Sequence, residues 1–248
     1  MEAVKAVKAM KATSGPTAAP RRRKPLLLRP SAKVVVFLLC LLPFAWLLRG
    51  AVLSVMGTNV LGANPAEALI RATGDWTLRF LCITLAVTPL RELTGQTAIA
   101  RFRRMLGLFT FFYGSVHFLC YSWLDRGLVW GDIVRDIAKR PFILVGTSAL
   151  LLMLPLAATS FNRAIKSLGA ARWRALHRAV YAVALLGLLH FFWMRSAKSN
   201  YAEVAVYAAI IAALLGWRLV TALGRRRQPA ASGAGGTGGS TISTASMP

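Results

Sequence analysis

The sequence predicts an all-α integral membrane protein, built as a six-helix transmembrane bundle with both tails in the cytoplasm. Hydrophobic residues make up 56% of the 248-residue chain, and charged residues make up only 16%. Six apolar runs approach the roughly 20 residues that a helix needs to cross a bilayer. The formal charge of +23 lies mainly between these runs, which indicates membrane topology and not a nucleic-acid-binding surface.

Helix-breaking and polar residues between the apolar runs indicate where each expected helix, and the membrane domain, begins and ends. Helices are expected over about 33–53, 76–91, 104–123, 141–159, 173–193 and 201–220. Residues 61–76 (LGANPAEALIRATGDW) predict a separate short interfacial helix, capped by Asn64, opened by Pro65 and ended by Gly74. One membrane domain over residues 33–220 follows. The basic segment 1–32 and the Gly/Ser/Ala-rich segment 221–248 are expected to be disordered cytoplasmic tails.

Basic residues are divided unevenly between the two sides of the membrane that these six helices define. Twenty-two Lys and Arg residues lie on the side of the tails, and nine lie on the opposite side. Six of the eight acidic residues fall on the side that is poorer in Lys and Arg. By the positive-inside rule the tails are cytoplasmic. The same basic residues suit anionic lipid headgroups.

Three histidines lie in or at the end of expected helices. His117 follows Arg104 by 13 residues, about 20 Å of helix, on a segment that runs outward. His190 follows Arg178 by 12 residues on another outward segment, so both histidines reach a similar depth in the periplasmic half. Two neutral imidazoles at one level are what a six-coordinate b-type haem requires, and haem fills the space between bundle helices. The alternative is two histidines that only bond neighbouring helices.

His177 requires a separate interpretation. It precedes His190 by 13 residues, which places it about 20 Å deeper on an ideal helix and excludes it from the same iron. A second haem near the cytoplasmic face would need an opposite ligand from the start of the third helix, where Arg103 and Arg104 stand. Otherwise His177 is an interfacial histidine beside Arg178.

The remaining polar residues form no recognisable catalytic motif. Acids of the outer connections are expected to be solvated: Asp75, Asp125, Asp132 and Asp136. The cysteines fall inside apolar segments without C-x-x-C spacing and are expected to be small buried hydrophobic residues: Cys40, Cys82 and Cys120.

Three motifs recur in order: TPLR at 88–91, RRMLGLFTFFYGSVH at 103–117, and the LHR…H pair that begins at 176 and ends at 190. With these motifs the chain, over about residues 34–220, resembles the ferric-reductase-like transmembrane domain family. Within that family it is similar to the haem-binding membrane subunits of bacterial periplasmic protein-methionine-sulfoxide reductase systems.

The resemblance implies an electron-transfer subunit of the inner membrane, separate from the catalytic subunit. Electrons would come from the quinone pool or a cytoplasmic flavin reductase and pass through haem b. They would leave to a periplasmic molybdopterin-containing subunit that reduces oxidised methionines in proteins.

By the same resemblance His117 and His190 ligate haem, and His177 is the cytoplasmic-side histidine. Relatives with two haems carry two histidines on each of two helices, whereas the third helix here carries one. Family members are also associated with FMN, whose phosphate suits Arg101, Arg103 and Arg104. Two other functions stay open: a haem b subunit for a different periplasmic oxidoreductase, and a cofactor-free proton or solute transporter that uses buried histidines.

Overall fold

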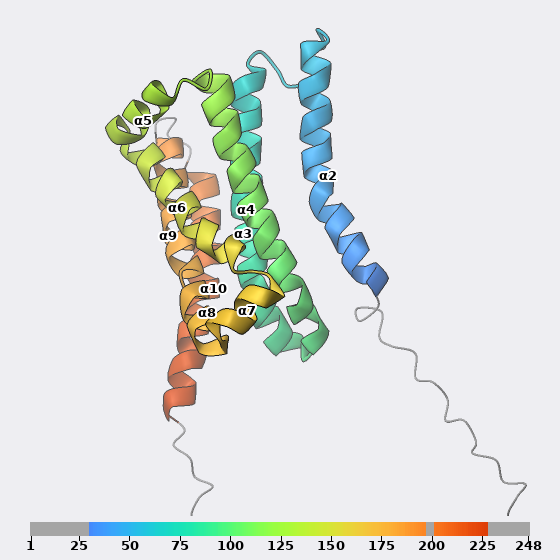
Figure 1. The fold of residues 1–248 in the computed structure, drawn as a ribbon, viewed down its shortest axis with the longest axis vertical. Helices are drawn as coiled ribbons and strands as arrows, with labels where there is room; N and C mark the ends of the chain where they lie inside the picture. The colour runs from blue at the N-terminus through green and yellow to red at the C-terminus, as the bar shows by residue number, and fades with distance from the viewer. Residues whose placement is uncertain (1–29, 197–200, 228–248) are drawn as a thin grey trace, which may run out of the picture.

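The computed structural model describes residues 30–196 and 201–227, and these residues form helices joined by short connections (Figure 1). The helices are α2 (Pro30–Val55), α3 (Pro65–Thr94), the 3₁₀ segment η2 (Thr97–Phe102), α4 (Arg103–Cys120), the π-helical turn η3 (Tyr121–Asp125), α5 (Trp130–Lys139), α6 (Pro141–Ala158), α7 (Asn162–Leu168), α8 (Ala170–His177), α9 (Val180–Ser196) and α10 (Ala202–Arg227). The expected tails lie outside the described residues except at 30–32 and 221–227, which are helical.

Five helical segments of the described chain are long and apolar enough to cross a membrane: Pro30–Val55, Thr97–Asp125, Pro141–Ala158, Ala170–Ser196 and Ala202–Gly224. The chain is therefore a multi-pass membrane protein. The helix expected over 76–91 lies within α3, which carries charged residues near both ends. α3 packs along α4 and also contacts α2, α9 and α10.

The start of α3 differs from the expected interfacial helix. Asn64 caps it as predicted, because its side chain accepts a hydrogen bond from Glu67 N, and Pro65 opens the first turn. Gly74, however, does not end a helix, since α3 continues without a break to Thr94. The glycine is needed there for close packing against α4 and not for a turn, so the two expected elements are one helix.

The expected helix over 173–193 is divided in two. α8 ends at His177 and α9 begins at Val180. Main-chain bonds from Arg178 N to Ala175 O and from Ala179 N to Leu176 O tighten this turn to an i→i−3 pattern. His177 and His190 therefore lie on different helices, and the ideal-helix estimate of their separation does not hold.

α2 is hydrogen-bonded to α4 beside Pro43, where α2 bends. Figure 1 shows α2 changing direction about half-way along its length, and Pro43 lies inside the helix. The hydroxyl of Tyr113 on α4 inserts at this point, accepting from Phe44 N at 2.9 Å and donating to Cys40 O at 2.9 Å. In a regular helix Phe44 N would donate to Cys40 O directly, so a side chain from another helix completes the ladder at the bend.

Two apolar clusters hold the helices together, and α3 contributes to both. One joins α3 to α6, α9 and α10 through Leu81, Met153, Val183 and Ile211. The other joins α2, α3 and α4 through aromatic side chains, in which Phe80 stacks on Tyr113 with ring centroids 5.0 Å apart. Cys40 and Cys82 are buried within these clusters as expected, and Cys120 is partly buried. α3 is thus the central helix of the bundle.

Candidate functional site

His117 and His190 face each other across the bundle. His117 lies near the end of α4 and His190 lies in the second half of α9. Their ring centroids are 6.1 Å apart, with an angle of 73° between the ring planes. Two imidazoles that bind one metal ion through Nε2 at about 2 Å each hold their centroids roughly 6 Å apart. The pair therefore has the spacing of two ligands to a single ion.

A main-chain carbonyl from a neighbouring helix fixes each ring. His117 Nδ1 lies 2.8 Å from Ile70 O on α3, and His190 Nδ1 lies 2.6 Å from Phe142 O on α6. Each contact is a hydrogen bond if Nδ1 carries the proton, which leaves the lone pair on Nε2. Metal-ligating histidines are commonly oriented in this way by a bond from the other ring nitrogen.

Glycines make room for both rings. A Cβ placed on Gly74 of α3 would lie 3.1 Å from His117 Cε1, and one placed on Gly146 of α6 would lie 2.8 Å from His190 Cε1 and Nδ1. A larger residue at position 146 would force the His190 ring to move, and one at position 74 would crowd the His117 ring. α3 therefore packs closely against the His117 ring, and α6 packs closely against the His190 ring.

The histidines line a cavity of about 610 Å³, which we call the outer cavity. Its wall includes apolar residues of four helices: Leu78, Gly114, Ile143, Leu150, Met153 and Phe191. Three arginines also line it, namely Arg71, Arg140 and Arg195. A flat apolar macrocycle that brings its own four metal ligands and carries two carboxylates fits these features, so the residues fit haem.

A buried carboxylate joins the connections at the outer end. Asp136 on α5 accepts from Tyr121 Oη at 2.6 Å and pairs with Arg126 at 3.0 Å and Arg140 at 2.9 Å. It is buried, so the expectation that Asp136 is a solvated loop residue is wrong. The cause is α5, an amphipathic helix in the expected loop, which turns Asp136 toward the bundle. Asp75 is also paired, at 3.8 Å from Arg195, and lies on α3.

His177 lies apart from the pair, in a second cavity of about 490 Å³ that we call the inner cavity. Its ring stacks on Trp173 with centroids 3.9 Å apart, and Nδ1 lies 3.1 Å from Trp173 O. Nε2 is buried and makes no hydrogen bond to another described residue. Arg103 and Arg104 line the same cavity, whereas Arg101 does not.

Three apolar side chains line both cavities: Leu81 of α3, Met153 of α6 and Val183 of α9. They form a thin apolar partition in the centre of the bundle, and all three belong to one packed cluster. The structure thus brings His117 and His190 together in one cavity and places His177, Arg103 and Arg104 in the adjacent one.

Sequence reasoning missed the residues that orient the candidate ligands. It predicts a helix end at Gly74 and gives Gly146 no role, and the carbonyls of Ile70 and Phe142 carry no side-chain signal. It also missed Arg218, whose guanidinium lines the inner cavity from α10. An arginine inside an apolar run, and a glycine in the middle of one, are the signals that could have pointed to these contacts.

Comparisons with known proteins agree with this architecture. The family model described as "Ferric reductase like transmembrane component" matches residues 73–188. No solved structure matches the chain significantly.

The chain is also similar over most of its length to proteins named "Protein-methionine-sulfoxide reductase heme-binding subunit MsrQ". The protein from Polaromonas naphthalenivorans is 64% identical over 79% of this chain and 88% of its own length. The proteins from Ralstonia nicotianae and Bordetella pertussis are 52% and 51% identical, over 82% and 79% of this chain and 91% of their own lengths. At this identity and coverage, the chain belongs to the MsrQ family.

Proposed function

We propose that the chain is a b-type cytochrome subunit of the bacterial inner membrane that passes electrons outward to a periplasmic methionine-sulfoxide reductase. The observation that carries this proposal is the pair His117 and His190, at 6.1 Å between ring centroids with each Nδ1 on a main-chain carbonyl. The names of its relatives, which call them heme-binding subunits, support the same cofactor.

In this function His117 and His190 would hold the haem iron through Nε2. The haem, when bound, supplies a reversible one-electron change. The carbonyls of Ile70 and Phe142 keep both rings in the ligating orientation and make the imidazoles better donors. Apolar side chains of the outer cavity, among them Leu150, keep water away from the site.

The direction of transfer depends on topology. We take α3 as the sixth crossing, because it is 30 residues long and packs at the centre of the bundle. α2 begins and α10 ends at the same end of the bundle (Figure 1), as an even number of crossings requires. With the basic side in the cytoplasm, the outer cavity faces the periplasm, and the membrane domain extends from about residue 33 to the last turns of α10.

Electrons would then enter at the inner cavity. His177, Arg103 and Arg104 are the residues proposed to hold the entry cofactor, either FMN through its phosphate or a second haem. The donor is the quinone pool or a cytoplasmic flavin reductase. The partition of Leu81, Met153 and Val183 separates this site from the outer cavity by one layer of side chains.

The proposed acceptor is a periplasmic, molybdopterin-containing catalytic subunit that repairs oxidised methionines in periplasmic proteins. The names of the relatives favour this partner over another periplasmic oxidoreductase. The fixed orientation of both histidines favours ligation over proton transport, since a proton carrier needs ring nitrogens free to exchange.

The three histidines test the proposal because their expected effects differ. His117→Ala and His190→Ala should each lose most haem or convert it to high-spin, measured by the Soret and α bands of dithionite-reduced protein. His177→Ala should keep the low-spin spectrum and slow reduction by the physiological donor. A colourless wild-type protein expressed with ample haem would instead favour a transporter. Loss of all haem in His177→Ala with an intact spectrum in His190→Ala would place the haem in the inner cavity.

A further inference from the structure

The short helix α5 has three different faces, because successive residues of an α-helix are about 100° apart around its axis. Ile133 faces the bundle and is only 1% exposed. Trp130 and Val134, one turn apart, form an apolar face and are 70% and 64% exposed. Arg135 and Lys139, also one turn apart, form an exposed, positively charged face. Part of the apolar surface of α5 therefore has no partner in the described chain.

Both ends of α5 are tied to helices that are long and apolar enough to cross a membrane. Residues 126–129 connect it to the segment Thr97–Asp125, and Arg140 alone connects it to Pro141–Ala158. A connection of four residues reaches at most about 14 Å, and main-chain bonds fold this one back, since Leu128 N donates to Ser122 O at 2.8 Å. α5 therefore lies at the level where the two spans end, and Figure 1 shows it at one edge of the bundle beside the start of α6.

Exposed apolar residues also precede and follow α5 in the chain. Those before it are Trp123, Leu124, Leu128 and Val129, and those after it on α6 include Leu144 and Leu151. Exposed apolar residues of a membrane span face lipid. A run of exposed apolar residues marks contact with a membrane or with a protein, and here the continuity with two spans favours the membrane.

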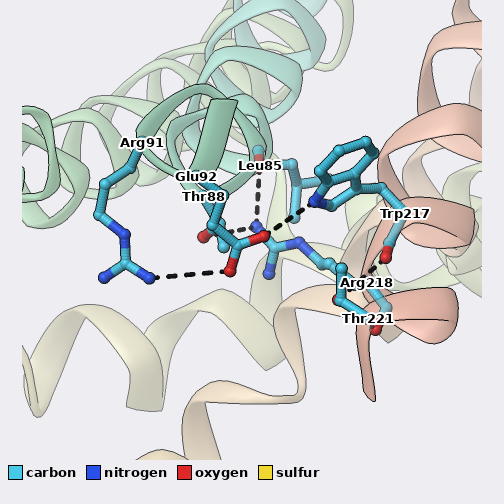
Figure 2. A network of polar contacts seen from close by, with 7 residues as sticks. All are labelled: Leu85, Thr88, Arg91, Glu92, Trp217, Arg218 and Thr221. Carbon is cyan, nitrogen blue, oxygen red and sulfur yellow. Dashed lines mark hydrogen bonds and ion pairs between the residues drawn. The ribbon is translucent and has the colours of Figure 1, made fainter. Parts of the chain in front are cut away.

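The opposite end of the bundle is held by hydrogen bonds between helices. Figure 2 shows Trp217 of α10 donating through Nε1 to the carboxylate of Glu92 on α3, at 2.9 Å. Arg218, the next residue of α10, donates to three oxygens of α3 and α9: Leu85 O at 2.8 Å, Thr88 Oγ1 at 3.3 Å and Tyr181 Oη at 3.0 Å. Polar side chains at that end therefore bind one helix to another.

Trp123 and Trp130 have no comparable partner. Both are exposed, and neither indole N–H donates a hydrogen bond to another residue that the structure describes. Tryptophan is enriched where a bilayer meets water, because its ring is apolar and its N–H bonds to headgroups or water. The two indoles therefore suit the boundary of a phospholipid layer.

We infer that α5 is a lipid-binding helix that lies in the membrane interface, with Trp130 and Val134 in the acyl layer and Arg135 and Lys139 at the phospholipid phosphates. An amphipathic interfacial helix buries its apolar face about 5–10 Å into the boundary between headgroups and acyl chains. The long basic side chains reach the phosphates from the opposite side of the helix. The bundle then lies beside α5, the lipid below it and water above it.

The lipid surface gives α5 a second point of attachment. On its buried face Asp136 pairs with Arg126 and Arg140, and Arg140 lines the outer cavity. On its apolar face the attachment is to lipid. This surface depends neither on the histidine pair nor on which side of the membrane the outer cavity faces.

Spin labels on three cysteine variants of the full-length protein test the inference, in nanodiscs of phosphatidylethanolamine and phosphatidylglycerol. Val134→Cys labels the apolar face of α5, Asp132→Cys labels its charged side, and Leu151→Cys labels an exposed residue within α6. Collisions with oxygen, which concentrates in lipid, and with a water-soluble nickel chelate are measured by power saturation of the electron paramagnetic resonance signal. The label at 134 should collide mainly with oxygen, as the label at 151 does, and the label at 132 mainly with the chelate.

The depth of the label and the background signal complete the test. The label at 134 should lie about 5–10 Å below the headgroup boundary, and the label at 151 should lie deeper. Labelled wild type gives the background, since Cys40 and Cys82 are buried and Cys120 is partly buried. A label at 134 that meets the chelate as often as the label at 132 overturns the inference, because the apolar face would then lie in water and be open to a protein. A label at 132 shielded like that at 151 overturns it as well.

Discussion

A Cβ on Gly146 would lie 2.8 Å from both Cε1 and Nδ1 of His190, closer than real Cβ contacts allow. The imidazole is held at this distance by its bond to Phe142 O, one turn earlier on the same helix. α6 therefore supplies both the acceptor and the space for His190.

Gly146→Ala should displace the His190 ring and impair haem binding. Alanine favours a helix by up to about 1 kcal/mol over glycine, so a loss of haem cannot come from a weaker helix. We expect at least a tenfold weaker haem affinity or a high-spin fraction in the absorbance spectrum. Gly216→Ala on α10, where nothing lies within 4 Å of the added Cβ, is the control and should leave the spectrum unchanged. An unchanged spectrum in Gly146→Ala would show that the site can move to accept a methyl group.

The sequence predicts that His117 and His190 lie at one level, but it does not predict which groups orient their rings. Helical rise is regular in long apolar helices, so counting residues from Arg104 and Arg178 predicts His117 and His190 at one level. A glycine in an apolar sequence can mark either the end of a helix or a close contact between helices. At Gly74 only the position of α4 decides between the two. The expectation for Asp136 is wrong for a similar reason, because a short amphipathic helix with mixed charge resembles a loop in sequence until its partners, Arg126 and Arg140, are known.

Asp136→Asn should loosen the outer end of the bundle. The substitution removes the negative charge that Arg126 and Arg140 share, and it weakens the bond from Tyr121. We expect a loss of about 1–3 kcal/mol in the free energy of unfolding, measured in mixed micelles. Asp132→Asn, whose carboxylate lies on the exposed face of α5 at 3.9 Å from Arg135, should cost no more than about 1 kcal/mol. Equal effects of the two substitutions would contradict a structural role for the buried carboxylate.

Tyr113→Phe should weaken the attachment of α2. Without the hydroxyl, Phe44 N and Cys40 O lose the group that bridges them at the Pro43 bend, and an unsatisfied buried main-chain group costs about 1–3 kcal/mol. The expected result is a lower midpoint of thermal unfolding with the haem spectrum retained. Tyr207→Phe, which removes only a 3.3 Å contact with Arg79, should change the midpoint much less. If α2 straightens and Phe44 N bonds Cys40 O directly, the midpoint will not fall.

The orientation of the bundle can be read with reporter fusions. The 22-to-9 division of Lys and Arg predicts that both tails lie in the cytoplasm. A reporter that is active only in the periplasm should be silent when fused after Arg227 and active when inserted near Asp132 on α5. The reverse pattern of reporter activity would show that the membrane orientation is opposite to the one proposed. Electron transfer would then have to run from the outer cavity to the inner one.

The bond between Arg218 and Leu85 O should depend on Pro89, and a double-mutant cycle can show it. Pro89→Ala restores an N–H that can donate to Leu85 O, as in a regular helix. In that background Arg218→Gln no longer leaves the carbonyl without a donor. The free-energy cost of Arg218→Gln should therefore fall by about 1 kcal/mol relative to its cost in the wild type. Arg79→Gln, whose partner is Tyr207 on the outer half of α10, should cost the same in both backgrounds. If Arg218→Gln costs as much in the Pro89→Ala background as in the wild type, the guanidinium does not replace the missing helical donor, and Thr88 and Tyr181 alone hold it in place.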